Sequence, residues 1–391
     1  MSETPMQQQT RISRNALFAR CAFLSTVAFA PKYLRPRVGS PFVCGGNWIK
    51  TGRMSTSRAN QTATLLANAT VLVAGGYTSN AMGIETILSD TEIYQPQTGV
   101  WNRTTRLHIA RAGHGAIRLH DGRVLVAGGV DTRDNAIAST ETYDPSYGTW
   151  RVTSTMIAPR MSFTVTLLRN GQAIAIGGSD NHTSALASTE LYNPRTGIWQ
   201  TVDRLRTPRS AHTATLLSDG KVLVAGGING IKFLSSAEIY DPYSRRWTPT
   251  TSMHNPRNAH AATLLADGRV LVAGGFDYHA LIPHAAAEVY DPRTAIWTPT
   301  EAMRSVRKGG QTATLLYNGS VLVVGGLTHD SVGAEIYNPQ TNEWAAITGM
   351  HNLRFEHTAT PLQNGAVLVA GGGNNTDNST RADAELYEAW S

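Results

Sequence analysis

The chain has 391 residues, 41% of them hydrophobic, so it can bury a large core and does not belong to the class of disordered proteins. Its formal net charge is +6, but residues 1–47 contribute +5 of this, which leaves the rest nearly neutral. A nearly neutral body without a nucleic-acid-binding motif predicts that nucleic acid is not a partner. The two cysteines, Cys21 and Cys44, exclude a disulfide framework and a four-thiolate zinc site from the remainder.

Residues 1–47 have the composition of a basic leader. The apolar stretch 21–30 follows three arginines and ends in Ala-Phe-Ala, which is similar to a signal-peptide cleavage site. An Arg-rich segment with few acids also fits an organelle transit peptide or an untargeted extension, and the stretch is too short to span a membrane. We expect an extracytoplasmic location, with an organelle or the cytoplasm as alternatives.

After the leader, a short apolar run that ends in two glycines recurs along the chain. Seven copies of the type VLVAGG, spaced 46 to 53 residues apart, begin at Val71, Val124, Ala173, Val222, Val270, Val321 and Val367. In six units Asp-Gly or Asn-Gly precedes the run and follows another strand-like segment. This dipeptide between two such segments is a strong signal of a β-hairpin. Together with 36 glycines, the pattern predicts an all-β protein.

Two further motifs repeat with the same period. A Trp is followed six residues later by Met or Leu and ten residues later by Arg, starting at Trp48, Trp101, Trp150, Trp199, Trp247, Trp297 and Trp344. A Glu is followed two residues later by Tyr at Glu92, Glu141, Glu190, Glu238, Glu288, Glu335 and Glu385. Each unit therefore has four strand-like segments: A before the hairpin turn, B the VLVAGG run, C with the Glu and Tyr, and D starting at the Trp. We interpret the repeated aromatic residues as core anchors.

This order of four short antiparallel strands resembles the kelch repeat, whose units form the blades of a β-propeller. The resemblance covers residues 48–390 at 49 residues per unit. It implies a seven-bladed propeller over 48–391, which follows the basic leader expected over 1–47. The chain starts with a lone segment D at Trp48 and ends with A, B and C. The N-terminal strand is therefore expected to complete the last blade and close the ring.

Galactose oxidase is a well-known enzyme with a seven-bladed kelch domain. Its copper radical site needs a Cys crosslinked to a Tyr, further Tyr and His ligands, and another domain after the propeller. The present sequence has no Cys after Cys44. The resemblance therefore implies the galactose oxidase scaffold without its copper site.

Antiparallel strands place the B–C and D–A loops together on one face of such a ring, here called the loop face. The A–B and C–D turns form the opposite turn face. The B–C loops differ in length and composition, which favours the loop face as the binding face. Beside it lies one arginine from each unit: Arg58, Arg111, Arg160, Arg209, Arg257, Arg307 and Arg354. In kelch propellers this position can contact acidic groups of a partner; the alternative is a buried pair with the segment C glutamate of each blade.

Three further residues of the loop face are ligand-binding candidates: Tyr77, Phe276 and His279. Tyr77 and Phe276 follow a Gly-Gly pair at the mouth of the central channel, where mostly apolar residues favour binding over metal chemistry. Several other histidines are expected on this face, but no pair has the spacing typical of metal ligands. We therefore predict no metal, no cofactor and no catalytic residue.

The leading hypothesis is a non-catalytic, monomeric kelch module that binds a protein segment or a glycan on the loop face. The alternative is a carbohydrate-active enzyme on the same face, similar to the kelch-type sugar mutarotases, because such redox-neutral chemistry needs no motif. The sequence does not identify the partner.

Overall fold

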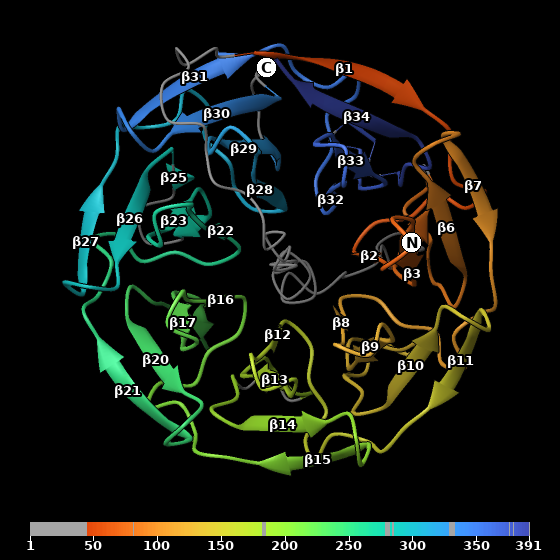
Figure 1. Cartoon of the computed structure of the whole chain (residues 1–391), viewed down its shortest axis with the longest axis horizontal. Helices are drawn as coiled ribbons and strands as arrows, with labels where there is room; N and C mark the ends of the chain where they lie inside the picture. Colours follow the sequence, from red (N-terminus) through yellow and green to blue (C-terminus); the bar gives the residue numbers. More distant parts are fainter. Residues whose placement is uncertain are drawn as a thin grey trace, which may run out of the picture.

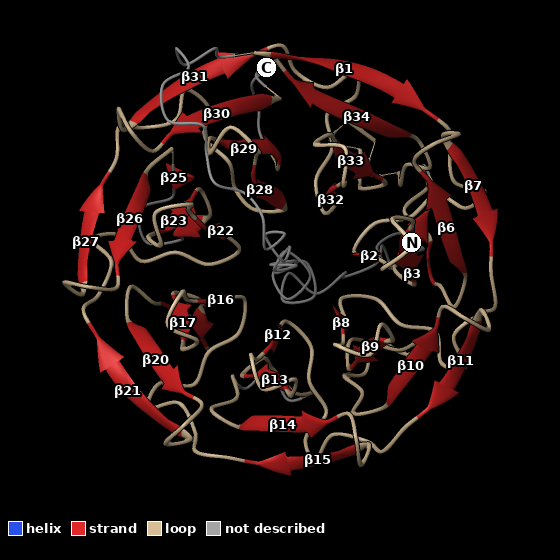
Figure 2. Cartoon of the chain, viewed as in Figure 1, coloured by secondary structure: helices blue, strands red, loops and turns tan. Residues whose placement is uncertain are grey.

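The computed structural model describes residues 45–80, 82–181, 185–277, 282–283, 285–327, 333–374, 376–377 and 379–390. The described part of the chain is built from strands, turns and loops, and seven four-stranded antiparallel sheets form a ring around a central axis (Figures 1 and 2). The predicted all-β, seven-bladed kelch-type propeller is confirmed. Within those ranges no helix is long and apolar enough to cross a membrane.

Each blade contributes one strand to each of four concentric positions. The innermost A strands are β2 (Thr62–Leu65), β8 (Gly115–Arg118), β12 (Thr164–Leu167), β16 (Thr213–Leu216), β22 (Ala261–Leu264), β28 (Gln311–Leu315) and β32 (Thr358–Pro361). The B strands are β3 (Val71–Ala74), β9 (Val124–Ala127), β13 (Ala173–Ile176), β17 (Val222–Ala225), β23 (Val270–Ala273), β29 (Val321–Gly325) and β33 (Val367–Ala370).

The two outer positions follow the same order. The C strands are β6 (Thr91–Gln95), β10 (Thr140–Asp144), β14 (Thr189–Asn193), β20 (Ala237–Asp241), β26 (Ala287–Asp291), β30 (Ala334–Asn338) and β34 (Ala384–Ala389). The outermost D strands are β7 (Val100–Arg103), β11 (Thr149–Val152), β15 (Ile198–Thr201), β21 (Arg246–Thr250), β27 (Ile296–Pro299), β31 (Glu343–Ile347) and β1 (Gly46–Thr51).

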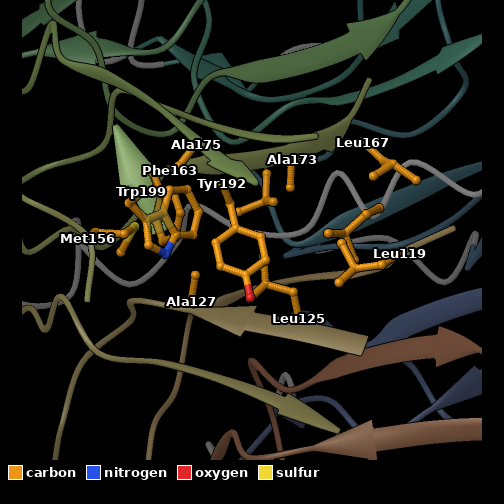
Figure 3. Close-up of a cluster of buried hydrophobic side chains, with 12 residues drawn as sticks. Leu119, Leu125, Ala127, Met156, Phe163, Leu167, Ala173, Ala175, Tyr192 and Trp199 are labelled. Carbon is orange, nitrogen blue, oxygen red and sulfur yellow. The ribbon is translucent and has the colours of Figure 1, made fainter. Parts of the chain in front are cut away.

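The B strands are buried on both sides because each blade packs between two others. In Figure 3, Leu125 and Ala127 of blade 2 pack against Tyr192 and Trp199 of blade 3 in one hydrophobic cluster. Tyr192 pairs directly with Trp199 across strands C and D, with ring centroids 5.1 Å apart. The same Tyr–Trp pair recurs in all seven blades at 4.9 to 5.2 Å. The fixed spacing of the Glu–Tyr and Trp motifs therefore places a Tyr–Trp pair at the same position in each blade, where it packs against the neighbouring blade.

The ring closes at blade 7, whose sheet order is β1-β34-β33-β32. β1 pairs with β34 over six residues, from Gly46 opposite Ala389 to Thr51 opposite Ala384. Trp48 packs against Tyr387 at 5.1 Å and donates its indole N–H to the Thr348 carbonyl oxygen of blade 6 at 2.7 Å. The predicted closure by the N-terminal strand is confirmed.

Closure by β1 gives a direct stability prediction. A chain that lacks residues 1–51 leaves β34 with an unpaired outer edge and Tyr387 without its Trp partner, so we expect a lower melting temperature and aggregation. A chain that lacks only residues 1–44 keeps β1 and is expected to melt like the full chain. Differential scanning calorimetry compares the three proteins, and equal melting temperatures for the two truncated chains would contradict this closure.

Candidate functional site

The seven predicted arginines form a buried frame with the seven segment C glutamates. In each blade the arginine Nη2 donates to the glutamate Oε1 at 2.5 to 3.1 Å. Its Nη1 donates to the carbonyl oxygen of the first glycine after strand B at 2.6 to 3.0 Å. All seven arginine side chains have no exposed surface. Of the two arrangements expected from the sequence, the buried Arg–Glu pair is therefore the one that forms. The arginines are shielded from solvent and do not form an exposed ligand-binding ring.

The two glycines of each B strand are explained by this frame. Gly128 has φ +61°, and a Cβ on it would lie 2.6 Å from the Arg160 carbonyl oxygen of the next blade. Gly129 has φ +92°, and a Cβ there would lie 2.5 Å from the Ala112 carbonyl oxygen. Only a residue without a side chain fits both the backbone conformation and the close approach of these carbonyl oxygens, the first from the next blade and the second from the same blade.

Each glutamate also holds the D–A loop above it. The backbone N–H of the residue after the repeated Met or Leu donates to the glutamate Oε2 at 2.7 to 2.9 Å in all seven blades. In three of the seven blades that residue is histidine, and its Nδ1 lies 2.7 to 2.9 Å from the same oxygen: His108, His254 and His351. Burial raises the pKa of Glu141, but the backbone and imidazole of His108 and the Arg111 charge outweigh it and hold the pKa below its ordinary value.

Four other histidines are buried between blades: His114, His212, His260 and His357. The His212 Nε2 lies 3.1 Å from the Thr164 hydroxyl of the preceding blade, and His357 contacts Thr312 in the same way. Burial, assisted by the neighbouring arginines, lowers the pKa of His212 and of His357 to about 3. These side chains are therefore neutral packing groups. Blades 1 and 6 have Gln61 and Gln311 at the same place, and both are buried.

The channel mouth on the loop face is where the predicted residue Tyr77 lies. Its backbone pairs with Ala59, the residue after Arg58, and its side chain packs with Ala112 and Val130 of blade 2. The buried Tyr77 hydroxyl donates to Glu356 Oε2 of blade 7 at 3.0 Å. Glu356 is itself buried and has φ +53°. This pair joins the first and last blades beside the channel.

The inner ends of the D–A loops form a ring of backbone bonds around the mouth. The N–H of Asn60 donates to the Glu356 carbonyl oxygen at 3.0 Å, and Ala259 donates to Ala211 in the same way. Residues at this place have positive φ in all seven blades, and the other six are Asn60, Gly113, Ser162, Ala211, Ala259 and Gly310. Glu356 is thus the one charged residue of this ring. The sequence analysis missed it, although its departure from the small or amide residues of the other units was the available signal.

Phe276, the second predicted residue of the mouth, is half-buried and pairs with Asn258 after Arg257. Its ring lies 6.0 Å from Phe233 of blade 4 in an edge-on arrangement. Phe233 was not predicted, because nothing in its local sequence distinguishes it from a core residue. His279 lies outside the described residues.

Three extra hairpins stand on the loop face, in blades 1, 4 and 5. They are β4 (Tyr77–Ser79) with β5 (Glu85–Ile87), β18 (Ile228–Asn229) with β19 (Lys232–Phe233), and β24 (Phe276–Asp277) with β25 (Ile282–Pro283). The first two carry apolar side chains at their tips: Met82 is 80% exposed, Ile84 61% and Ile231 87%. The loop face therefore combines a half-buried aromatic floor with projecting apolar tips.

The ring and its repeated Arg–Glu frame define a kelch-repeat β-propeller. The family model of the KLHDC2/KLHL20/DRC7 Kelch-repeats domain matches residues 162–373, which is more than half of the chain. The protein belongs to this kelch-repeat family. No curated protein matches the sequence.

Among solved structures, the chain is similar to a copper-containing fungal alcohol oxidase of the AA5 family. The two share 18% sequence identity with a TM-score of 0.69, over 88% of this chain and 76% of the oxidase. This likeness shows the propeller fold alone. No group of three or more His, Cys, Asp or Glu in the described ranges is placed to hold a metal ion, and the Tyr77 phenol at the mouth is bonded to a carboxylate. These donors do not fit a copper centre, and we derive no copper chemistry for this chain.

The buried frame predicts a large cost for removing one arginine. Arg209→Met leaves Glu238 buried without its cation, and we expect a loss of about 3–5 kcal/mol in the free energy of unfolding. The matched control is Arg293→Met, because the Arg293–Asp291 pair has a similar distance of 3.0 Å but Arg293 is 74% exposed. Urea unfolding should show a large shift for the first variant and none for the second; equal shifts would contradict the role of the frame.

The neutral histidines predict instability in acid. Unfolded histidine binds a proton below about pH 6.5, while folded His212 and His357 resist protonation down to about pH 3. Stability is therefore complete above the unfolded pKa and falls as the pH drops, by about 1.4 kcal/mol per pH unit for each histidine. His212→Gln with His357→Gln, the residue found in blades 1 and 6, should lower the slope of stability between about pH 5.5 and 4.5 by about 3 kcal/mol per unit. An unchanged slope in urea unfolding would contradict this.

Proposed function

We propose that this kelch propeller is a non-catalytic binding module that holds a segment of another protein on its loop face. The observation that supports the proposal is that the blades differ from one another on the loop face. The sheets, the turns and the Arg–Glu frame repeat in every blade, whereas the three extra two-stranded hairpins in the part of the chain that the structure describes lie on the loop face, in blades 1, 4 and 5. A rigid repeated frame that supports unequal loops is the arrangement used for recognition in other repeat scaffolds.

The side chains on these hairpins favour a protein segment as the ligand. Met82, Ile84 and Ile231 are flexible or branched apolar side chains that project into water from these hairpins, and exposed apolar groups on a binding face favour contact with a protein. Glycan sites rely on exposed aromatic faces, but Tyr77 is buried and Phe276 is half-buried. Kelch propellers in general mediate protein interactions, which agrees with this choice.

The enzyme alternative lacks comparable support. The acid–base pair near the channel mouth is Tyr77 with Glu356, and both residues are more than nine-tenths buried. A general acid or base must reach the substrate within hydrogen-bond distance, and this pair instead links two blades. The fungal oxidase supports the fold only, and we propose no reaction.

Peptide-display selection on the immobilised full chain tests the proposal. We expect selected peptides to bind in solution with micromolar or better affinity. The triple variant Met82→Ser, Ile84→Ser and Ile231→Ser should weaken binding about tenfold or more, because it removes most of the apolar contact. The matched control is Tyr147→Ser with Tyr243→Ser, two exposed residues of the turn face. Peptides that lose affinity only for the control variant, or a library without binders, would contradict the proposal.

A further inference from the structure

The charges of the loop face are unequally distributed. The seven B–C loops, taken as 77–90, 130–139, 179–188, 228–236, 276–286, 327–333 and 373–383, contain nine carboxylates and three basic residues. Their net charge is −6 with histidine neutral, in a chain whose net charge is +6. Two of these carboxylates are paired with arginines outside the loops: Asp383 Oδ2 lies 2.7 Å from Nη2 of the frame residue Arg354, and Asp90 Oδ1 lies 2.9 Å from Arg106 Nε. The rest of the loops still has a net charge of −4.

The acidic loops lie close to the channel. The first residue of a B–C loop pairs with the inner end of a D–A loop beside the mouth, as Tyr77 does with Ala59 and Phe276 with Asn258. The start of each D–A loop instead lies above strand C, further from the axis, and it is there that exposed arginines such as Arg204, Arg206 and Arg304 occur. These arginines therefore lie at the rim of the loop face, whereas Lys308 lies at the inner end of its D–A loop, where its N–H donates to the Leu327 carbonyl oxygen.

Among the described residues, one buried acceptor at the mouth also lacks a donor. Asn258 is 7% exposed, and its Oδ1 has no hydrogen-bond partner among the described residues. Its backbone is fixed on both sides by hydrogen bonds with Phe276, at 3.1 and 3.2 Å. A buried acceptor without a donor is costly, so this oxygen favours a ligand that brings N–H groups to the mouth.

We propose that the segment bound on the loop face carries lysine or arginine side chains next to apolar ones. This inference rests on the proposed function and names the chemistry of its partner. The apolar stems of lysine and arginine match the exposed Met82 and Ile231, while their charged ends match the B–C carboxylates. Their N–H groups, like those of the peptide backbone, also suit the Asn258 oxygen.

The same selection tests this inference with a different readout. Among peptides whose binding depends on Met82, Ile84 and Ile231, lysine and arginine should be at least about twice as frequent as in the unselected library, with acidic residues depleted. Binders of this face without that enrichment would overturn the inference and leave the proposed function standing. A library without any binder of this face would overturn both.

Two matched sets of substitutions then identify the charges responsible. The loop-face set is Asp131→Asn, Asp134→Asn and Asp377→Asn; the turn-face set is Asp144→Asn, Asp219→Asn and Asp267→Asn. Asp131, Asp377 and all three turn-face aspartates accept the backbone N–H two residues later, and Asp134 has φ +61°, which asparagine tolerates. Asparagine therefore preserves these turns and removes the charge; in the turn-face set it also removes the ion pairs of Asp219 with Lys221 and of Asp267 with Arg269.

The strongest selected peptide is measured by fluorescence anisotropy against both sets. The loop-face set should weaken its binding about tenfold in about 50 mM salt and much less in about 500 mM salt, because salt screens exposed charges. The turn-face set should leave the affinity unchanged. Equal effects of the two sets, or an affinity independent of salt, would overturn the inference, as would occupation of this face by a neutral oligosaccharide or a second copy of the chain.

Discussion

The buried Arg–Glu pair is the interaction on which the rest of the structure depends. One arginine in each blade bonds a strand C carboxylate and the carbonyl oxygen at the end of strand B, and the carboxylate in turn holds the D–A loop. Burying both charges is costly, and it is tolerated because the hydrogen bonds are complete on the glutamate side. The pair therefore fixes strand B, strand C and the D–A loop relative to one another through directional hydrogen bonds, which a hydrophobic contact does not supply.

This frame separates stability from recognition. Because the frame and the Tyr–Trp pairs are made in every blade, the middle parts of the B–C loops can differ between blades, while their ends, such as Tyr77, remain bonded to the ring. The B–C loops, with their apolar hairpin tips and their surplus of carboxylates, are thus carried on a rigid ring. Rigid support lowers the entropy lost on binding, which is the advantage of a propeller as a recognition scaffold.

Most of the fold could be predicted because the same residue types recur at the same spacing in each blade. The Trp-to-Arg spacing set both the Trp199 contact and the position of Arg209, and the lone segment D at Trp48 predicted ring closure. The site was less predictable. Glu356, Phe233 and Asn258 matter because of residues distant in sequence. The departure of Glu356 from the repeat was visible in the sequence, but its partner was not, and Phe233 and Asn258 had no such signal. The arginines were visible, but their burial depended on the three-dimensional pairing with glutamate.

Amide hydrogen exchange of the full chain, with and without a saturating selected peptide, tests the central claim most directly. The account predicts slower exchange on binding in the B–C loops of blades 1, 4 and 5, since these carry the projecting hairpins. The A–B and C–D turns should exchange at the same rate in both states. Protection that is confined to those turns would show that the ligand binds the opposite face and would contradict the account.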